Sequence, residues 1–255
     1  MRFQTAIARV PKFPNILLMP AIDALTRCFG ALRLSLILLA LCLPVPASAQ
    51  IGASASLDSD YRFRGDSLSD ERPALSFNVS YDHSSGAYIG GSATASVSAH
   101  DGVNFVGHTE YLGYVTETKM GPSLDFGISN AKYANYRNED AYAHYIELYA
   151  GLVTDKVSAY IRYSANYFQK GADTIYIDLN GAQRVARNWR VFGHAGALSA
   201  LSESALPDGR RHRYDIRAGI AHKFDNFELH MAVTAIFPQP EDDSVGAVLG
   251  ATCFF

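Results

Sequence analysis

SVGAVLGATCFF (Ser244–Phe255) ends the chain, and larger apolar residues alternate with smaller ones along its length. Val245 and Leu249 belong to one series, and Gly246 and Gly250 belong to the other. Successive side chains of a β-strand leave opposite faces of the backbone, so this period of two predicts a strand. The ends of soluble domains are usually poorly ordered, whereas this strand runs to a terminal Phe-Phe. The stretch therefore predicts a final strand that completes a sheet.

The N-terminal region has the order of parts typical of a secretory leader. Two arginines precede the apolar run Leu34–Leu43, and a motif of small residues ending at Ala49 follows it. This order predicts a signal peptide over residues 1–49, cleaved after Ala49, and a mature domain over residues 50–255. Translation from Met19 would give the leader a more usual length. The alternative is an uncleaved anchor, but the run is shorter than the roughly 20 apolar residues of a membrane-spanning helix.

The cysteine and charge counts exclude several classes of protein. Cys28 and Cys42 lie in the predicted leader, so the mature chain keeps only Cys253 and forms no internal disulfide. Cys42 follows Leu41 rather than a small residue, which argues against lipid attachment. Removing residues 1–50 takes away five of 22 basic residues and one of 25 acidic residues, which leaves a formal charge of −7. This acidic balance lacks the basic surface that nucleic-acid binding requires.

Alternation recurs throughout the mature chain, without a helical segment of useful length, and predicts an all-β fold. The strands are about 10–13 residues long, close to the roughly 9–11 of a tilted membrane strand and above the roughly 5–6 usual in soluble sheets. Short turns and longer polar loops alternate between them, which is typical of transmembrane barrels. The stretches 105–117 and 189–200 alternate weakly, and their facing stays open. The twelve expected strands cover residues 52–64, 74–82, 87–97, 105–117, 122–132, 142–153, 157–168, 174–185, 189–200, 213–224, 227–236 and 245–255.

The apolar face of these strands is assigned to the outside of a barrel. In the clearest strands this face carries no charge, and an Arg or Lys near the bilayer midplane would cost about 2–4 kcal/mol. Tyr61, Phe63, Tyr167 and Phe168 lie near expected strand ends, where membrane barrels carry aromatic girdles. Lipid forbids an open sheet edge, so a single-domain, up-and-down antiparallel transmembrane barrel is expected. In the alternative, a soluble secreted barrel, the same face would form the core.

The opposite face carries the charged residues and is expected to line the lumen. In the first expected strand, Asp60, Arg62 and Arg64 are predicted to face the lumen, and Tyr61 and Phe63 to face lipid. Such residues either form a charged solute path or brace the interior through ion pairs, and the sequence leaves both readings open. The predicted lumen-lining residues are Asp58, Asp60, Arg62, Arg64, Glu147, Arg162, Asp178, Arg213, Asp215, Arg217, Lys223 and Glu228.

An N-terminal motif and two later segments resemble a known family. The matching residues are Ser59–Gly65, Ser67, Ser69-Asp70, Pro73-Ala74, Tyr81, Ser85-Gly86, Tyr88, Gly90 and Glu147–Leu152. They resemble the TorF family of bacterial porins, specifically over residues 59–90 and diffusely beyond. The resemblance implies a Gram-negative outer-membrane barrel with a pore role, and it brings no substrate, cofactor or catalytic residue. The terminal Phe255 is similar to the aromatic end of outer-membrane barrels, which implies recognition by the outer-membrane assembly machinery.

The sequence thus predicts an outer-membrane porin for passive diffusion of small hydrophilic solutes, with lipid around it and with no cofactor, metal or nucleic-acid partner. Twelve strands lie between filled barrels of about eight and porins of about 16–18, so open and plugged lumens both remain. One alternative is a non-conducting barrel that acts structurally or binds partners through its loops. A less favoured alternative is a hydrolase that uses His83 with Ser84 or Ser85, or His212 with Asp215.

Overall fold

The computed structural model of this chain describes residues 50–98, 102–119, 121–134, 143–201, 206, 209–238 and 245–255. These residues belong to one compact unit, Ser48–Phe255. The predicted leader, with its cleavage site and alternative start, lies outside the described residues. No described segment is a helix long and apolar enough to cross a membrane.

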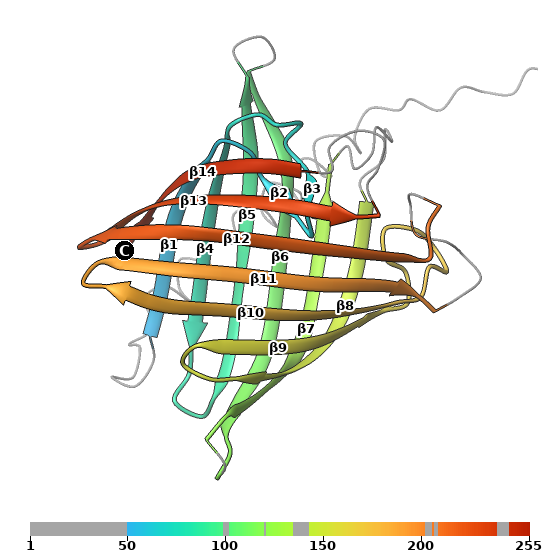
Figure 1. Cartoon of the computed structure of the whole chain (residues 1–255). Coiled ribbons are helices and arrows are strands. Elements are labelled where there is room, and N and C mark those ends of the chain that lie inside the picture. Colours follow the sequence, from blue (N-terminus) through green and yellow to red (C-terminus); the bar gives the residue numbers. More distant parts are fainter. Residues whose placement is uncertain are drawn as a thin grey trace, which may run out of the picture. The chain divides into compact units, whose positions relative to one another are not determined.

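Twelve strands of the described chain form a closed antiparallel barrel, which confirms the predicted all-β fold (Figure 1). Neighbouring strands in the ring are also successive barrel strands in the chain, so the order is up-and-down. The barrel strands are β1 (Gln50–Asp58), β4 (Ala74–Asp82), β5 (Ala87–Ser98), β6 (Gly102–Glu117), β7 (Ser123–Tyr133), β8 (Ala143–Val153), β9 (Val157–Ser164), β10 (Thr174–Ala186), β11 (Trp189–Ala200), β12 (His212–Phe224), β13 (Phe227–Phe237) and β14 (Val245–Phe254). A separate hairpin, β2 (Arg62–Phe63) and β3 (Asp66–Ser67), lies between β1 and β4 in the chain.

The C-terminal strand closes the ring, as its alternation predicts. β14 pairs with β13 on one edge and with β1 on the other, where the register begins with Ser54 opposite Phe254. The amide of Phe255 continues this seam by donating a hydrogen bond to the carbonyl oxygen of Ala53 (2.9 Å). Closure matters because unpaired backbone groups at a sheet edge are too costly in hydrocarbon.

The outer face of the barrel is apolar. Ile216, Met231 and Leu249 lie on β12, β13 and β14, and their exposed fractions are 46%, 55% and 61%. Met231 stands opposite both Leu249 and Ile220, so apolar side chains continue from strand to strand. An apolar surface of this extent is unfavourable in water and suits contact with lipid. This orientation confirms the transmembrane barrel and excludes the soluble alternative, in which these side chains would fill the core.

One stretch of the outer face, on β6, β7 and β8, is polar. Glu110 accepts a hydrogen bond from Asn130 Nδ2 (2.7 Å), and His144 Nε2 lies 2.5 Å from Asn130 Oδ1. His108 Nε2 lies 3.1 Å from Glu110 Oε1. The stretch adjoins the connection between β7 and β8, at a barrel rim. Polar groups cost less there than at mid-membrane, which accounts for their position.

A β-bulge contributes to the weak alternation of the expected strand 105–117. Thr94 of β5 pairs with Gly107 of β6, but Ala95 pairs with Phe105, so Val106 is an extra residue. A bulge shifts the alternation of side chains by one position. The two ends of β6 therefore follow different alternation phases, which the sequence pattern alone does not separate.

The connections mostly alternate in length as predicted, and they give the barrel two different rims; the exception is the connection 99–101 between β5 and β6, which is shorter than two of the short turns. The turns at residues 83–86, 118–122, 154–156, 187–188 and 225–226 lie at one end, which we call the short-turn rim. The other end, the long-loop rim, carries the remaining connections. These include residues 59–73 and 165–173.

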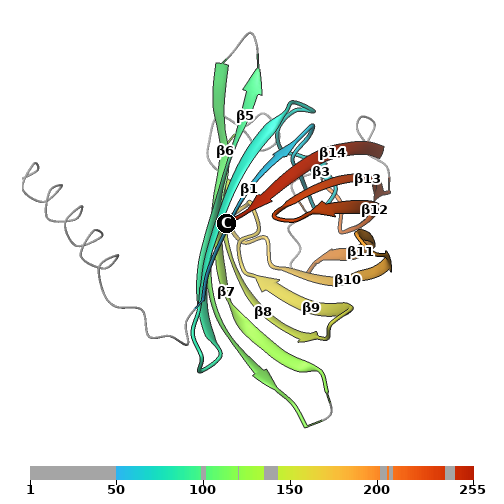
Figure 2. The same cartoon turned by 90° about the vertical axis from the view of Figure 1, so that its left-hand side faces the viewer.

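The prediction for the first strand is wrong beyond Asp58. β1 ends there, and residues 59–73, which we call the plug segment, fold into the barrel with the β2–β3 hairpin (Figure 2). The backbone turns at Arg64 and Gly65, whose φ angles of 49° and 82° lie in the left-handed region that a strand does not use. A Cβ atom on Gly65 would lie 2.4 Å from Ile236 Cγ1, so only glycine allows the hairpin to approach β13 this closely.

Aromatic residues predicted to face lipid are instead turned inward. Tyr61 and Phe63 of the plug segment, together with Phe168, pack against a buried cluster that includes Tyr167, which is 1% exposed. β9 ends at Ser164, four residues earlier than predicted. The cluster, which we call the rim core, consists of Ala131, Tyr133, Tyr145, Tyr167, Tyr176, Leu198, Ala200 and Leu206. Burying these large aromatic side chains is more favourable than exposing them in the positions that the local alternation predicts. Side chains therefore fill the barrel near the long-loop rim.

Candidate functional site

Two cavities lie inside the barrel and share part of their lining. The first has a volume of about 590 Å³ and the second about 490 Å³. Arg62 and Arg64 of the plug segment line both cavities, as do Asn180 and His194 of the wall. The first cavity also includes Lys156, in the turn between β8 and β9, so it reaches the short-turn rim.

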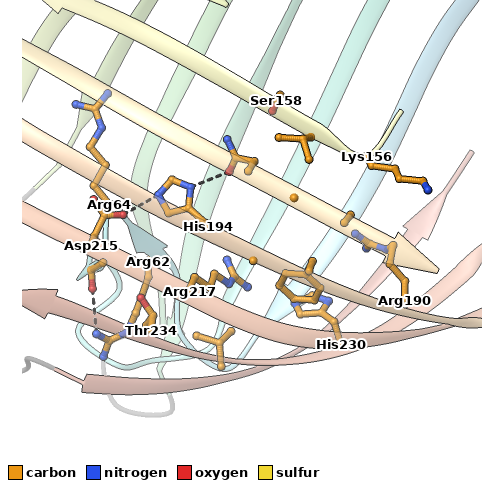
Figure 3. A pocket seen from close by; sticks show the side chains of 18 of the residues that line it. Arg62, Arg64, Lys156, Ser158, Arg190, His194, Asp215, Arg217, His230 and Thr234 are labelled. Carbon is orange, nitrogen blue, oxygen red and sulfur yellow. Dashed lines mark hydrogen bonds and ion pairs between the residues drawn. The ribbon is translucent and has the colours of Figure 1, made fainter. Parts of the chain in front are cut away.

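The two cavities differ in the side chains that line them. The first, which we call the basic cavity, is lined by Arg62, Arg64, Lys156, Arg190 and Arg217, against the acids Asp215 and Glu228 (Figure 3). The second, which we call the tyrosine cavity, is lined by Tyr88, Tyr111, Tyr133, Tyr145, Tyr149, Tyr160 and Tyr176. The interior of the barrel therefore offers one predominantly cationic surface and one surface of aromatic rings and hydroxyl groups.

A buried ion pair fixes the plug segment to the wall. Arg64 Nη2 donates to both carboxylate oxygens of Glu147, at 2.7 and 2.9 Å. The guanidinium also lies 3.9 Å from the ring centroid of Tyr176, within the range of a cation–π contact. Burial, the largest influence, lowers the pKa of Arg64, but the charge of the Glu147 carboxylate and smaller contributions from three neighbouring tyrosines together raise it above its ordinary value. Burial likewise raises the pKa of the nearby Tyr167 hydroxyl.

A second contact holds the turn of the hairpin, and a third organises its base. Arg213 Nη2 of β12 donates to Asp66 Oδ2 (2.5 Å) and to the carbonyl oxygen of Arg64 (3.3 Å). Asp60 accepts hydrogen bonds from Arg62 Nε (2.5 Å) and Ser67 Oγ (2.6 Å). Charge-assisted hydrogen bonds are stronger than neutral ones, so the plug segment has a defined conformation.

Further charged pairs connect strands of the inner wall, either neighbouring strands or, for Arg190 and Glu228, strands on either side of β12. Arg162 Nε lies 2.9 Å from Asp178, and Arg190 Nη2 lies 2.6 Å from Glu228. Asp215 Oδ1 lies 2.8 Å from His194 Nε2. These contacts join residues of β9 to β13 in pairs. The alternating sequence pattern predicts that these residues share one face, but it does not predict which residue pairs with which.

The polar centre of the tyrosine cavity was not predicted from the sequence. Asp125 of β7 accepts hydrogen bonds from the hydroxyls of Tyr88 (2.5 Å) and Tyr160 (2.6 Å), and the hydroxyls of Tyr88 and Tyr149 lie 2.7 Å apart. The available signal was Asp125 itself, which alternates with Leu124 and so falls on the polar side of its strand. Tyrosine is amphipathic, and its place in an alternating pattern does not decide its facing.

The twelve predicted lumen residues fall into three groups. Asp60, Arg62 and Arg64 belong to the plug segment rather than to the wall. Lys223 lies outside both cavities near the short-turn rim, where its Nζ is 5.6 Å from the ring centroid of Phe254. The other eight lie on barrel strands with inward contacts or cavity positions: Asp58, Glu147, Arg162, Asp178, Arg213, Asp215, Arg217 and Glu228.

Of the residue pairs considered for hydrolysis, the structure brings His83 and Ser85 into contact but not His212 and Asp215. His83 Nδ1 contacts Ser85 Oγ at 2.9 Å within an exposed turn. His212 contacts Ser199 (3.1 Å), whereas Asp215 turns inward to His194. His212 and Asp215 therefore do not meet. Among the described residues, no group of three His, Cys, Asp or Glu side chains is arranged to hold a metal ion.

One family model matches most of the chain. It is described as a bacterial protein of unknown function (Gcw_chp), and the match covers residues 45–239. No curated protein sequence matches the chain significantly. The matched description does not carry the TorF name, so that resemblance stays a prediction.

Solved structures share the fold at low sequence identity. The structure titled "NanC porin structure in rhombohedral crystal form" has a TM-score of 0.53 and 8% identity, and the match covers 81% of this chain and 100% of that one. A structure titled "KdgM porin" has a TM-score of 0.49 and 13% identity, with 80% of this chain and 99% of that one covered. At these identities, the similarity to the first establishes a common barrel fold and nothing about the solute.

Proposed function

We propose a porin function for this chain, which belongs to the Gcw_chp family of bacterial proteins of unknown function. The leader over residues 1–49 directs export across the inner membrane, the barrel inserts into the outer membrane, and small hydrophilic solutes diffuse passively through its lumen. The observation that carries the proposal is a charged, hydrogen-bonding interior enclosed by an apolar outer face. The TorF-like motif within residues 59–90 and the fold shared with a structure named as a porin support it.

The proposed route runs from the short-turn rim through the basic cavity to the plug segment. Lys156 marks the start of this route, and Arg62 and Arg64 mark the place where the plug segment meets it. Beyond them the rim core narrows the path. We therefore expect a small conductance that increases when the plug segment is displaced.

Shortening the plug segment tests this function directly. In the variant, residues 61–72 are replaced by a short Gly-Ser linker, which removes the β2–β3 hairpin and leaves all twelve barrel strands. We expect discrete channels in planar bilayers for both proteins, with a several-fold larger conductance for the variant because side chains no longer fill the long-loop rim. Heat-modifiable migration on gels verifies that both barrels are folded. Two folded proteins that never open channels would rule out the porin function.

A non-conducting barrel is the second candidate, and the plug segment is the observation that favours it. Arg64 and Glu147 are both buried, and a contact of this kind resists displacement. In this case the intact protein would stay closed and only the shortened variant would conduct. The same bilayer measurement therefore separates a narrow porin from a barrel whose plug is permanent.

We further propose that the terminal Phe255 is recognised by the outer-membrane assembly machinery. Its side chain is 76% exposed, although its backbone amide is paired in the seam, so the ring is available to a partner. Deleting Phe255 is expected to lower the amount of folded barrel in the outer membrane of cells several-fold, while refolding into lipid vesicles stays near the wild-type yield. Immunoblotting of membrane fractions measures the first, and gel migration the second. An equal loss of folded barrel in cells and in lipid vesicles would contradict recognition and indicate a purely structural role for Phe255.

A further inference from the structure

A row of hydrogen-bonding side chains crosses the inner wall of the basic cavity. The strand register places Asn180 of β10 opposite His194 of β11, His194 opposite Arg217 of β12, and Arg217 opposite Thr234 of β13. All four line the basic cavity, and Figure 3 shows Arg217 among the labelled residues of this wall. We call this set the donor row.

The plug segment supplies a fifth member above the last strand of the row. Thr234 stands opposite Gly246 of β14, and a Cβ atom on Gly246 would lie 2.3 Å from the Arg62 guanidinium carbon. The absence of a side chain at Gly246 thus makes room for Arg62. Two arginines, Arg62 and Arg217, therefore reach the same end of the cavity from different parts of the chain.

The carboxylates around the row are engaged by other side chains. Arg62 is paired with Asp60, and Asp215 is engaged by His194 and by the Tyr176 hydroxyl. Other inward carboxylates also have partners. The pairs are Glu147 with Arg64, Asp178 with Arg162, Glu228 with Arg190, Asp66 with Arg213 and Asp58 with His230. Among the described residues, none of these carboxylates forms an ion pair with Arg217, although the charge of Asp58 acts on it.

The Nε atom of Arg217 is buried and has no hydrogen-bond partner among the described residues. The nearest aromatic contact of its guanidinium is the ring of Phe192, at 5.7 Å to the centroid. Charged groups removed from bulk water are normally paired. An arginine on the wall of a cavity whose Nε has no partner among the described residues is therefore suited to a ligand that accepts hydrogen bonds and carries a negative charge.

We propose that the donor row binds the carboxylate of a small, hydroxylated anion and that the proposed porin uses this site to favour anionic solutes. The arginine fork of Arg217 matches two carboxylate oxygens, and the second amide hydrogen of Asn180 and the hydroxyl of Thr234 offer hydrogen-bonding groups for ligand hydroxyls. Both ring nitrogens of His194 are already engaged, by Asn180 and Asp215. The cavity volume of about 590 Å³ lies within the usual range for small-ligand sites. Lys156 adds a positive charge at the entrance. The selectivity rests on the proposed porin function, whereas the binding does not.

Calorimetric titration of the folded barrel with sodium gluconate tests the binding, and sorbitol is the neutral probe of the same carbon skeleton. We expect saturable gluconate binding and none for sorbitol. Arg217→Gln is expected to weaken gluconate binding about tenfold, the lower end of the effect of a charged hydrogen bond, and Arg217→Lys to weaken it less. Arg187→Gln is the matched control, because it removes the same charge from an exposed turn outside the cavity.

Equal gluconate affinity in the wild type and Arg217→Gln, or equal binding of sorbitol, would overturn the site. The reversal potential in a KCl gradient tests selectivity separately, with a preference for chloride expected in the wild type and a shift toward zero in Arg217→Gln but not in Arg187→Gln. If channels form but their reversal potential shows no such shift, the proposed anion selectivity is ruled out and the porin function is not. If the protein binds gluconate but never forms channels, the porin function is ruled out and the binding site is still supported.

Discussion

Replacing Glu147 by Gln is expected to lower the free energy of unfolding by about 3–5 kcal/mol, the cost of leaving one member of a buried ion pair without its partner. Arg64 would remain among aromatic rings with no carboxylate to offset its charge. Release of the plug segment relieves this cost, so we also expect the channel conductance to rise toward that of the plug-shortened variant. Denaturant unfolding in lipid vesicles and single-channel recording measure the two effects.

Glu228→Gln is the matched control for this experiment. It removes the same charge from a comparable wall pair, but its partner Arg190 is 42% exposed, and pairs with such access to water contribute about 0–1 kcal/mol. We expect little change in unfolding free energy and no increase in conductance. If Glu147→Gln behaved like Glu228→Gln, the ion pair would not be what holds the plug segment.

The second large effect concerns the outer face. Met231→Arg is expected to destabilise the barrel by about 2–4 kcal/mol in a bilayer, because Met231 lies midway along β13 on the apolar surface. Equilibrium folding into lipid vesicles at graded urea concentrations measures the difference. The loss should shrink in detergent micelles, which adapt more easily to a charged side chain.

His144→Arg is the control for depth in the membrane. It also points outward, but it lies in the polar stretch beside the connection of β7 and β8, where an added charge costs about 0–1 kcal/mol. The difference in folding free energy between Met231→Arg and His144→Arg indicates where the middle of the bilayer lies along the strands. Equal costs at Met231 and His144 would contradict a membrane that spans the middle of β13.

Alternation predicted the barrel well because lipid and lumen impose opposite requirements on successive residues. It predicted the path of residues 59–64 wrongly, since Asp60-Tyr61-Arg62-Phe63-Arg64 alternates as cleanly as any strand in the chain. What decides this segment is non-local, namely the pocket of aromatic residues around Phe63 and the carboxylate of Glu147, 83 positions away from Arg64. Tertiary contacts override a local pattern in such cases.

The site could be predicted only in part, for a related reason. A period of two assigns a residue to a face, but it does not give the register between strands. The register is what sets Arg217 beside His194 and Thr234. Asp125 and its tyrosines were missed because a lone acid on a strand has no sequence motif, and their convergence depends on four different strands.

The plug segment stands near one rim only, so in the proposed porin the two directions of travel would meet different obstacles. A molecule that arrives from the short-turn rim first passes Lys156 and the donor row, and reaches the hairpin only afterwards. One that comes from the long-loop rim encounters the hairpin at once. A pore built in this way has no mirror symmetry along its axis, so its current at equal and opposite voltages need not be the same.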